Sequence, residues 1–239
     1  EGETFENALK EAQNLGYAER NPEADVEGHD TCRKIAILTS MATGKTVNYE
    51  DIYTEGITKI TDIDFKYAEK MGTSIKLFGT SRMDGNEVHA WVAPVMIGKD
   101  HPLYAVNDVF NGILVKGNML GTSMFYGSGA GKLPTASAVV ADVVDCAKNK
   151  GRNIMMSWSE EKLNLLQIDD VKSRFFVRVS GHAAERQSEI EELFGKVEIV
   201  AVPSLSEEFA FITGEITEQE YREKAEKLDG IQSRIRARI

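Results

Sequence analysis

The sequence predicts an α+β protein: a mixed sheet with flanking helices, followed by a small βαββαβ unit. Three observations carry this prediction. Helix-period apolar patterns alternate with strand-like runs over the first 150 residues. Two of those runs are joined by an Asp-Gly pair, which favours a tight hairpin turn. From residue 172 onward, strand and helix signals follow one another in the order βαββαβ.

Two helices are expected near the start of the chain. The first covers residues 4–15, with Thr4 as its candidate N-cap and Gly16 as its C-cap. The second begins at about Glu27 and ends near Gly44. Its apolar side is expected to contain five residues at roughly helical spacing: Cys32, Ile35, Ile37, Leu38 and Met41.

A hairpin is expected in the middle part of residues 1–150. It is preceded by a short helix or turn at residues 51–60 and by a helix at residues 62–71 that Gly72 ends. Residues 74–81 and 87–96 are strand-like on either side of the Asp-Gly turn. Trp91 lies in the second strand, and its side chain is expected either to fill the core or to cover an interface.

Two further strands, at residues 111–115 and 122–126, lead into the last helix of this part. That helix is expected at residues 135–148 and is strongly apolar on one side. Such a stripe on the surface needs a covering partner. The sequence therefore predicts an exposed apolar stripe here when this chain is taken alone.

The C-terminal βαββαβ unit ends in a strand of alternating character. Its elements are expected at residues 174–179, 183–194, 197–202, 209–214, 217–228 and 231–239. Thr217 and Glu220 form a capping box at the start of the second helix. In the last strand, three arginines alternate with apolar residues: Arg234, Arg236 and Arg238. They are interpreted either as an anion-binding patch or as a solvated face of the strand.

These signals divide the chain into three parts. Residues 1–150 form the larger domain and residues 151–171 a linker. Residues 172–239 form the small second domain, whose element order is that of a ferredoxin-like unit.

Composition excludes several classes of partner. The 239 residues contain 28 Lys and Arg against 38 Asp and Glu, which gives a formal net charge of −10. This charge argues against binding to nucleic acid or to an anionic membrane. No apolar run approaches the roughly 18 residues of a membrane span.

The remaining composition fits a protein of the reducing cytoplasm. Cys32 and Cys146 form neither a disulfide framework nor a metal-ligand spacing, and both are expected as core thiols. The four histidines are scattered, so that no protein-built metal site is expected.

Charged residues gather at the start of the second helix. Asp30 and Lys34 are four residues apart and share one helix face, which an acidic segment containing Asp25 approaches. In a half-buried cleft, a lysine held by carboxylates can donate and accept protons, because burial lowers its pKa. The other reading is a solvent-exposed ion pair that contributes only about 0.3–0.5 kcal/mol.

A glycine-rich loop joins the strand at residues 122–126 to the apolar helix. Gly127, Gly129 and Gly131 alternate there, although the pattern is not GxGxxG because Lys132 follows. Free backbone N–H groups at a helix start can hold an anion. A tight strand-to-helix turn that only needs small residues explains the glycines equally well.

Two long motifs carry a family resemblance. GYAERNPEADVEGHDTCRK at residues 16–34 and FYGSGAGKLPTASAVVADV at residues 125–143 resemble the signature segments of homoserine dehydrogenase, in the same order. The resemblance implies that Lys34 is the acid/base at the substrate hydroxyl and that Glu19, Asp25 and Asp30 bind the substrate. It also implies contact of Gly129, Ala130 and Gly131 with the cofactor.

The resemblance further implies an NAD(P)-dependent enzyme that interconverts L-homoserine and L-aspartate 4-semialdehyde in threonine, methionine and isoleucine biosynthesis. NAD(P) is then bound mostly by an N-terminal nucleotide-binding domain. We therefore expect this chain to be the C-terminal part of the enzyme, inactive alone, and to assemble as a homodimer or higher homo-oligomer. The alternative function is a non-catalytic dimeric amino-acid-sensing module.

Residues 172–239 resemble an ACT domain, the amino-acid-sensing module often fused to such dehydrogenases. The effector turn of ACT domains is usually of the DRPG type. Here the turn at residues 180–185 keeps Gly181 but lacks the aspartate and the proline. The resemblance therefore supports the fold of this unit more strongly than it supports an effector site.

Overall fold

The computed structural model describes residues 5–16, 20–152 and 158–239. The chain has an α+β fold that divides into two compact units. The first, called the sheet unit here, contains residues 22–98 and 158–239. The second, called the hairpin unit, contains the described residues of 3–21 and 99–157.

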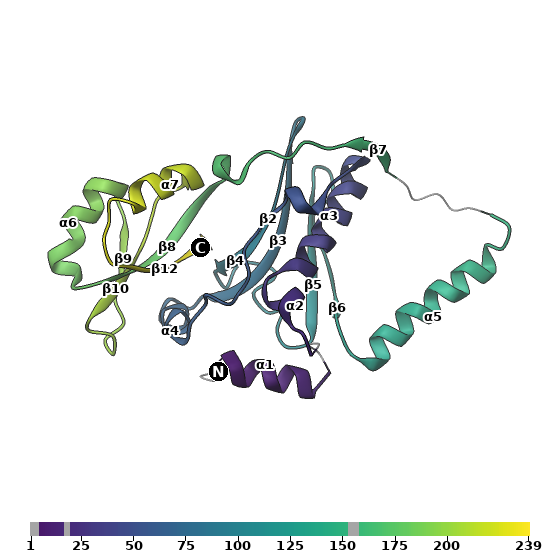
Figure 1. Cartoon of the computed structure of the whole chain (residues 1–239), viewed down its shortest axis with the longest axis horizontal. Helices are drawn as coiled ribbons and strands as arrows, with labels where there is room; N and C mark the ends of the chain where they lie inside the picture. Colours follow the sequence, from purple (N-terminus) through teal and green to yellow (C-terminus); the bar gives the residue numbers. More distant parts are fainter. Residues whose placement is uncertain (1–4, 17–19, 153–157) are drawn as a thin grey trace. The chain divides into compact units, whose positions relative to one another are not determined.

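The sheet unit is built on one mixed eight-stranded sheet (Figure 1). Its main path runs β2 (Tyr53–Thr54), β4 (Glu87–Ile97), β12 (Ile231–Arg238), β8 (Lys172–Ser180), β10 (Glu208–Ile212) and β9 (Glu198–Val200). Two strands lie off this path: β3 (Ser74–Asp84) pairs with β4, and β11 (Ile216–Thr217) pairs with β8.

The parallel pairing of β12 with β4 makes the sheet continuous. Arg236 lies opposite Val95, Ala237 opposite Met96 and Arg238 opposite Ile97. The C-terminal strand therefore belongs to the same sheet as the β3–β4 hairpin. The compact units accordingly differ from the three parts expected from the sequence, and the division into 1–150, 151–171 and 172–239 stays a prediction.

The C-terminal elements follow the expected order: β8, α6 (Ala183–Phe194), β9, β10, α7 (Glu218–Ala225) and β12. The predicted capping box is confirmed, because Thr217 and Glu220 bind each other's backbone N–H groups. The expected linker is partly structured. It contains β7 (Ser159–Lys162), which pairs with β1 (Lys45–Thr46), and the short helix η2 (Ile168–Asp170).

Three α-helices and one 3₁₀ turn complete the N-terminal part of the sheet unit: α2 (Glu23–Val26), α3 (His29–Thr43), η1 (Tyr49–Asp51) and α4 (Asp62–Met71). The ends of α3 and α4 are confirmed, since Gly44 and Gly72 adopt the left-handed conformation after them. The short helix or turn expected at residues 51–60 is confirmed only at the two ends, where Asp51 ends η1 and the N–H of Ile60 donates to Ile57 in a turn. Between them lies β2, which pairs with β4.

The core residues of α3 differ in part from the expected apolar side. Cys32 and Ile35 are buried against the sheet, together with Val92 of β4. Ile37, Leu38 and Met41 are 50%, 37% and 48% exposed. The helix thus has a second apolar face that no residue of the sheet unit buries within the described part of the chain.

Several single positions are decided by burial. Trp91 is 3% exposed, which makes it a core residue. Cys32 is buried as expected, whereas Cys146 is exposed and the expectation of a core thiol is wrong there. The interpretation of the arginines of the last strand as a solvated or anion-binding face is wrong for Arg234 and Arg236, which pair with Glu55 and Glu218. Arg238 is exposed.

The hairpin unit consists of α1 (Phe5–Asn14), the strands β5 (Phe110–Gly117) and β6 (Gly121–Ser128), and α5 (Lys132–Lys148). The two strands form a separate antiparallel sheet. Helix α5 exposes Val139, Val140 and Val143 at 58%, 59% and 63%. The predicted exposed apolar stripe is therefore confirmed for this chain.

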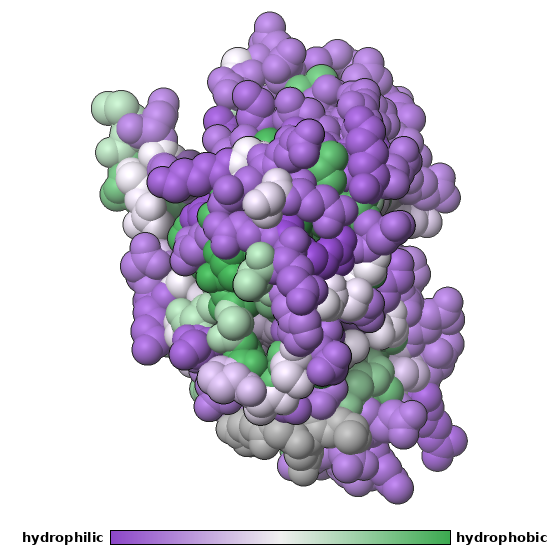
Figure 2. Space-filling view, turned by 90° about the vertical axis from the view of Figure 1, so that its left-hand side faces the viewer, coloured by the Kyte–Doolittle hydropathy of each residue, from purple (hydrophilic) through white to green (hydrophobic). Residues whose placement is uncertain are grey.

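On the face drawn in Figure 2, most surface residues are hydrophilic, and they surround a smaller hydrophobic area. In the part of the chain that the structure describes, no helix combines the length and the apolar character needed to cross a membrane.

A buried ion-pair network ties α4 to the C-terminal strands. The fully buried Asp64 accepts hydrogen bonds from Thr61, from Arg178 at 2.9 Å and from Ser233 at 2.7 Å. Arg178 also binds Glu208 through two hydrogen bonds. Removing one partner of a buried ion pair leaves an uncompensated charge, which is strongly destabilising.

We therefore predict that Asp64→Ala lowers the free energy of unfolding by about 3–5 kcal/mol, measured by urea denaturation. The matched control is Asp62→Ala on the same helix, whose carboxylate is 66% exposed and lies 3.9 Å from Lys66. It is expected to change the free energy by less than about 0.5 kcal/mol. Equal losses in the two variants would contradict the role of the network.

Candidate active site

The first motif folds into α2, a tight turn and the start of α3. Gly28 is the N-cap of α3 and has a φ of 78°. A Cβ at this position would lie 3.1 Å from Cγ1 of Val92, so that both the backbone conformation and the close packing on β4 require glycine. The turn therefore places Asp25 before it and Asp30 after it at fixed positions on the sheet unit.

The structure brings Lys34 and Asp30 together. The Lys34 Nζ lies 2.6 Å from Oδ2 of Asp30, one helical turn earlier. The side chains are 61% and 46% exposed, so the pair is on the surface of this chain and not in the half-buried cleft that the first reading of the sequence expects. Ile37, Leu38 and Met41 continue the same exposed helix face.

The other predicted site residues are distributed over the chain. Asp25 lies on α2 and is exposed. Glu19 lies outside the described residues. Gly129, Ala130 and Gly131 belong to the hairpin unit, where they join β6 to α5.

The glycine loop has local structural reasons for its small residues. A Cβ at Gly129 would lie 1.8 Å from Nδ2 of Asn111, and Gly131 has a φ of 115°. Gly131 is also the N-cap of α5 and provides no side-chain cap. A tight turn thus requires the glycines, and it leaves N–H groups of the first helical turn without a capping side chain.

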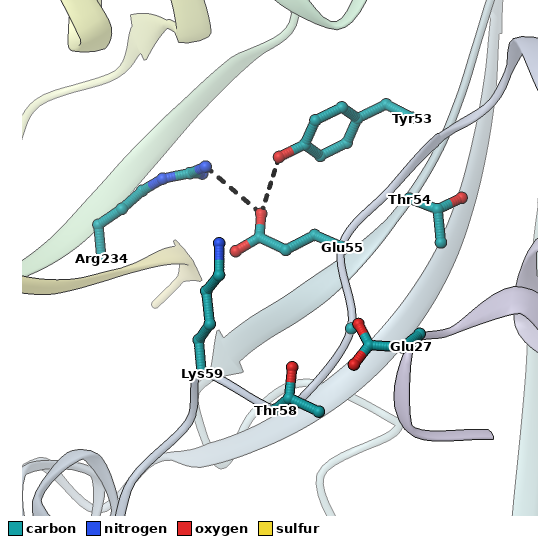
Figure 3. A pocket seen from close by; sticks show the side chains of 8 residues that line it. Glu27, Tyr53, Thr54, Glu55, Thr58, Lys59 and Arg234 are labelled. Carbon is teal, nitrogen blue, oxygen red and sulfur yellow. Dashed lines mark hydrogen bonds and ion pairs between the residues drawn. The ribbon is translucent and has the colours of Figure 1, made fainter. Parts of the chain in front are cut away.

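A polar cavity of about 210 Å³ lies beside the first motif in the sheet unit (Figure 3). Its wall is formed by eight residues: Glu27, Tyr53, Thr54, Glu55, Gly56, Thr58, Lys59 and Arg234. Glu27 belongs to the motif itself. No residue predicted from the sequence as part of the site is among these described lining residues.

Glu55 is the centre of this cavity wall. In Figure 3, Tyr53 and Arg234 converge on its carboxylate, and the Lys59 side chain points toward it. Its Oε2 accepts hydrogen bonds from Tyr53 at 3.0 Å, Arg236 at 2.9 Å and Arg234 at 3.3 Å. Burial acts to raise the pKa of Glu55, but the charges of Arg234 and Arg236 outweigh it and hold the pKa below its ordinary value.

Arg236 is the least exposed charged group near the cavity. Its side chain is 2% exposed and lies over the rings of Tyr53 and Trp91, with 5.3 Å from the guanidinium carbon to each ring centroid. Its Nε donates to Glu218 of α7 at 2.5 Å. Burial alone lowers the pKa of Arg236, but Glu218 and Glu55 reverse this and raise it above its ordinary value.

Glu55 was not predicted from the sequence, and its partners Arg234 and Arg236 were predicted only as part of a solvated or anion-binding strand face. The alternation of arginine with apolar residues in the last strand was the available signal, because a strand with both faces buried needs carboxylates opposite its arginines.

Within the described residues, no group of three or more His, Cys, Asp or Glu side chains could hold a metal ion.

Comparison with known sequences identifies relatives of the first part of the chain. The family model described as homoserine dehydrogenase matches residues 1–144. A homoserine dehydrogenase of Synechocystis is 42% identical over 190 residues, which cover 74% of this chain and 44% of that protein. One of Bacillus subtilis is 40% identical over 179 residues, which cover 73% of this chain and 41% of that protein.

Solved structures extend the similarity to the whole chain. A homoserine dehydrogenase from Thiobacillus denitrificans has a TM-score of 0.85 at 32% identity and covers 100% of this chain. One from S. aureus, solved at pH 6.0, has a TM-score of 0.79 at 30% identity and covers 99%. The matched regions make up 59% and 60% of those two chains.

The present chain thus spans less than two thirds of each of these relatives. The two motifs resemble those of homoserine dehydrogenase, and the fold is similar to that of a solved homoserine dehydrogenase. The first motif contains the paired residues Lys34 and Asp30. Because the family model matches residues 1–144 of 239, the chain belongs to the homoserine dehydrogenase family.

Proposed function

We propose that this chain supplies the substrate-binding and proton-transfer part of a homoserine dehydrogenase. The reaction interconverts L-homoserine and L-aspartate 4-semialdehyde, with NAD(P) as the hydride carrier. The single observation that supports this best is the 2.6 Å contact between Lys34 and Asp30 on a helix face that also exposes apolar side chains. A charged pair beside Ile37, Leu38 and Met41 suits a cleft that closes only when a further domain covers this face.

Lys34 is the proposed acid/base. It takes the proton of the substrate hydroxyl when homoserine is oxidised, and it returns a proton to the carbonyl oxygen when the aldehyde is reduced. Asp30 holds the Lys34 ammonium in place and, with Glu19, binds the ammonium group of the amino-acid substrate. Asp25 supports this acidic site from α2.

NAD(P), when bound, supplies the hydride chemistry. The residues of this chain that suit contact with it are Gly129, Ala130 and Gly131. The first-turn N–H groups of α5 lack a side-chain cap and can donate to a phosphate. Most of the cofactor is bound by a nucleotide-binding domain outside this chain, so that the chain is inactive alone.

The wider proposals follow the family. The enzyme is cytoplasmic, acts in threonine, methionine and isoleucine biosynthesis, and is a homodimer or higher homo-oligomer. Residues 172–239 are an ACT-like domain of ferredoxin-like topology, in agreement with the order β12–β8–β10–β9 of their strands. The side chain of Arg186 packs over Gly181 in the effector turn and donates to the carbonyl oxygens of Ser180 and Asp229.

The first test uses the full-length protein that carries this chain. We predict that Lys34→Ala lowers kcat for NAD(P)-linked oxidation of L-homoserine by about 10²–10⁴-fold, because the general acid/base is lost. The matched control is Lys66→Ala on α4, which also removes a lysine paired with an aspartate four residues earlier. It is expected to leave kcat unchanged.

Two results would count against these assignments. An active wild type with an unaffected Lys34→Ala variant contradicts the role of Lys34 but not the reaction. A folded wild type that converts neither homoserine nor the aldehyde contradicts the proposed function and favours a non-catalytic amino-acid-sensing module.

Asp30 is expected to affect substrate binding. We predict that Asp30→Asn raises KM for L-homoserine by about tenfold or more, since a hydrogen bond to a charged group contributes about 1.5–3 kcal/mol. KM for the nucleotide is expected to stay the same. Steady-state kinetics with each substrate varied in turn give this comparison, and equal increases in both KM values contradict a specific role in binding homoserine.

A further inference from the structure

We propose that Glu55 is a positioning residue, which holds residues 54–57 against the turn at residues 26–28 and thereby fixes Asp25 and Asp30 for the substrate. This inference deepens the proposed function and rests on it for its kinetic consequence. The structural part, which concerns the position of the turn, stands on contacts within the sheet unit alone.

The backbone around Glu55 lies directly on the motif turn. The N–H of Ile57 donates to the carbonyl oxygen of Val26 at 2.8 Å. A Cβ on Gly56 would lie only 2.4 Å from that same oxygen and 2.5 Å from Cα of Glu27. The two segments are therefore in backbone contact, and a shift of one by a few tenths of an ångström must move the other.

The turn also packs against residues 54–57 at Gly28. A Cβ there would meet Cγ2 of Thr54 at 3.4 Å and the carbonyl oxygen of Glu55 at 3.7 Å. The carbonyl oxygen of Gly28 in turn accepts the N–H of Cys32, one of the first hydrogen bonds of α3 at 2.8 Å. Residues 54–57 thus support both the end of α2 and the start of the helix that carries Asp30 and Lys34.

The side chain of Glu55 anchors this support to the C-terminal strand. Its one oxygen Oε2 binds Tyr53, Arg234 and Arg236, and its backbone N–H donates to Val92 of β4 at 2.8 Å. Its side chain is 19% exposed. Because three donors meet one partly buried oxygen, the carboxylate has little freedom to move.

The arginines that hold Glu55 are themselves fixed. Arg236 lies opposite Val95 in the parallel pairing of β12 with β4 and is enclosed by Tyr53, Trp91 and Glu218. Arg234 lies over the rings of Phe175 and Tyr221. The other charged groups of the cavity wall are Lys59 and Glu27, one of each sign. Glu55 is therefore the acidic link between rigid β12 and the segment that supports the motif turn.

The test uses hydrogen–deuterium exchange and kinetics on the full-length protein with Glu55→Gln, which keeps the shape of the side chain and removes its charge. Peptides covering residues 26–32 and 54–58 are expected to exchange about tenfold faster than in wild type. kcat/KM for L-homoserine is expected to fall by about tenfold to a hundredfold. KM for the nucleotide should change by less than about twofold, since the proposed cofactor contacts belong to the hairpin unit, whose residues make none of the contacts described for Glu55.

The matched control is Glu208→Gln. Glu208 is 15% exposed and also binds a buried guanidinium, that of Arg178, but it does so on β10, at the β8 pairing. This variant should lower the melting temperature about as much as Glu55→Gln and leave exchange in residues 26–32 unchanged. If Glu55→Gln does not fold, Arg234→Gln replaces it, because Arg234 is the weaker and more exposed partner at 3.3 Å and 23%.

The outcomes are distinct. Faster exchange in residues 26–32 and a loss specific to homoserine, in Glu55→Gln alone, support the proposal. Equal exchange in Glu55→Gln and Glu208→Gln overturns it and leaves Glu55 a purely structural residue. A wild type that does not oxidise homoserine overturns the proposed function, whereas the exchange data still decide whether Glu55 fixes the turn.

Discussion

The buried guanidinium of Arg236 is the constraint on which the sheet unit depends. A charged group at 2% exposure is unfavourable unless it is paired and hydrogen-bonded. Its partners come from three parts of the chain: Glu55 beside β2, Glu218 on α7, and the rings of Tyr53 and Trp91. These groups meet where β12 pairs with β4, so the ion pairs and the parallel strand pairing support one another.

A single sheet for the motif and the C-terminal elements follows from this constraint. The second polar network, in which Arg178 binds Asp64 and Glu208, joins α4 to β8 and β10 in the same way. Both networks are buried, and their hydrogen bonds form only when donor and acceptor face one another. They therefore fix the register of the strands as well as adding stability. The C-terminal part is thus built into the body that carries Lys34.

The surface of the chain has the opposite character. The face of α3 that bears Lys34 and the face of α5 that bears Val139, Val140 and Val143 are both exposed and largely apolar. Such faces on a charged protein are typical of contact with further structure. A rigid interior and open apolar faces together fit a chain that spans only part of the length of its relatives.

The sequence by itself determined the local structure and the candidate chemistry. Helical spacing and glycine ends located α3 and α4, the Asp-Gly turn located the β3–β4 hairpin, and four-residue spacing predicted the contact of Lys34 with Asp30. These features depend on residues a few positions apart. Only the tertiary structure decided the pairing of β12 with β4 and the contact of Arg236 with Glu55, 181 residues away. A local pattern carries no information on such a partner, because burial and charge compensation are settled only when the whole sheet assembles.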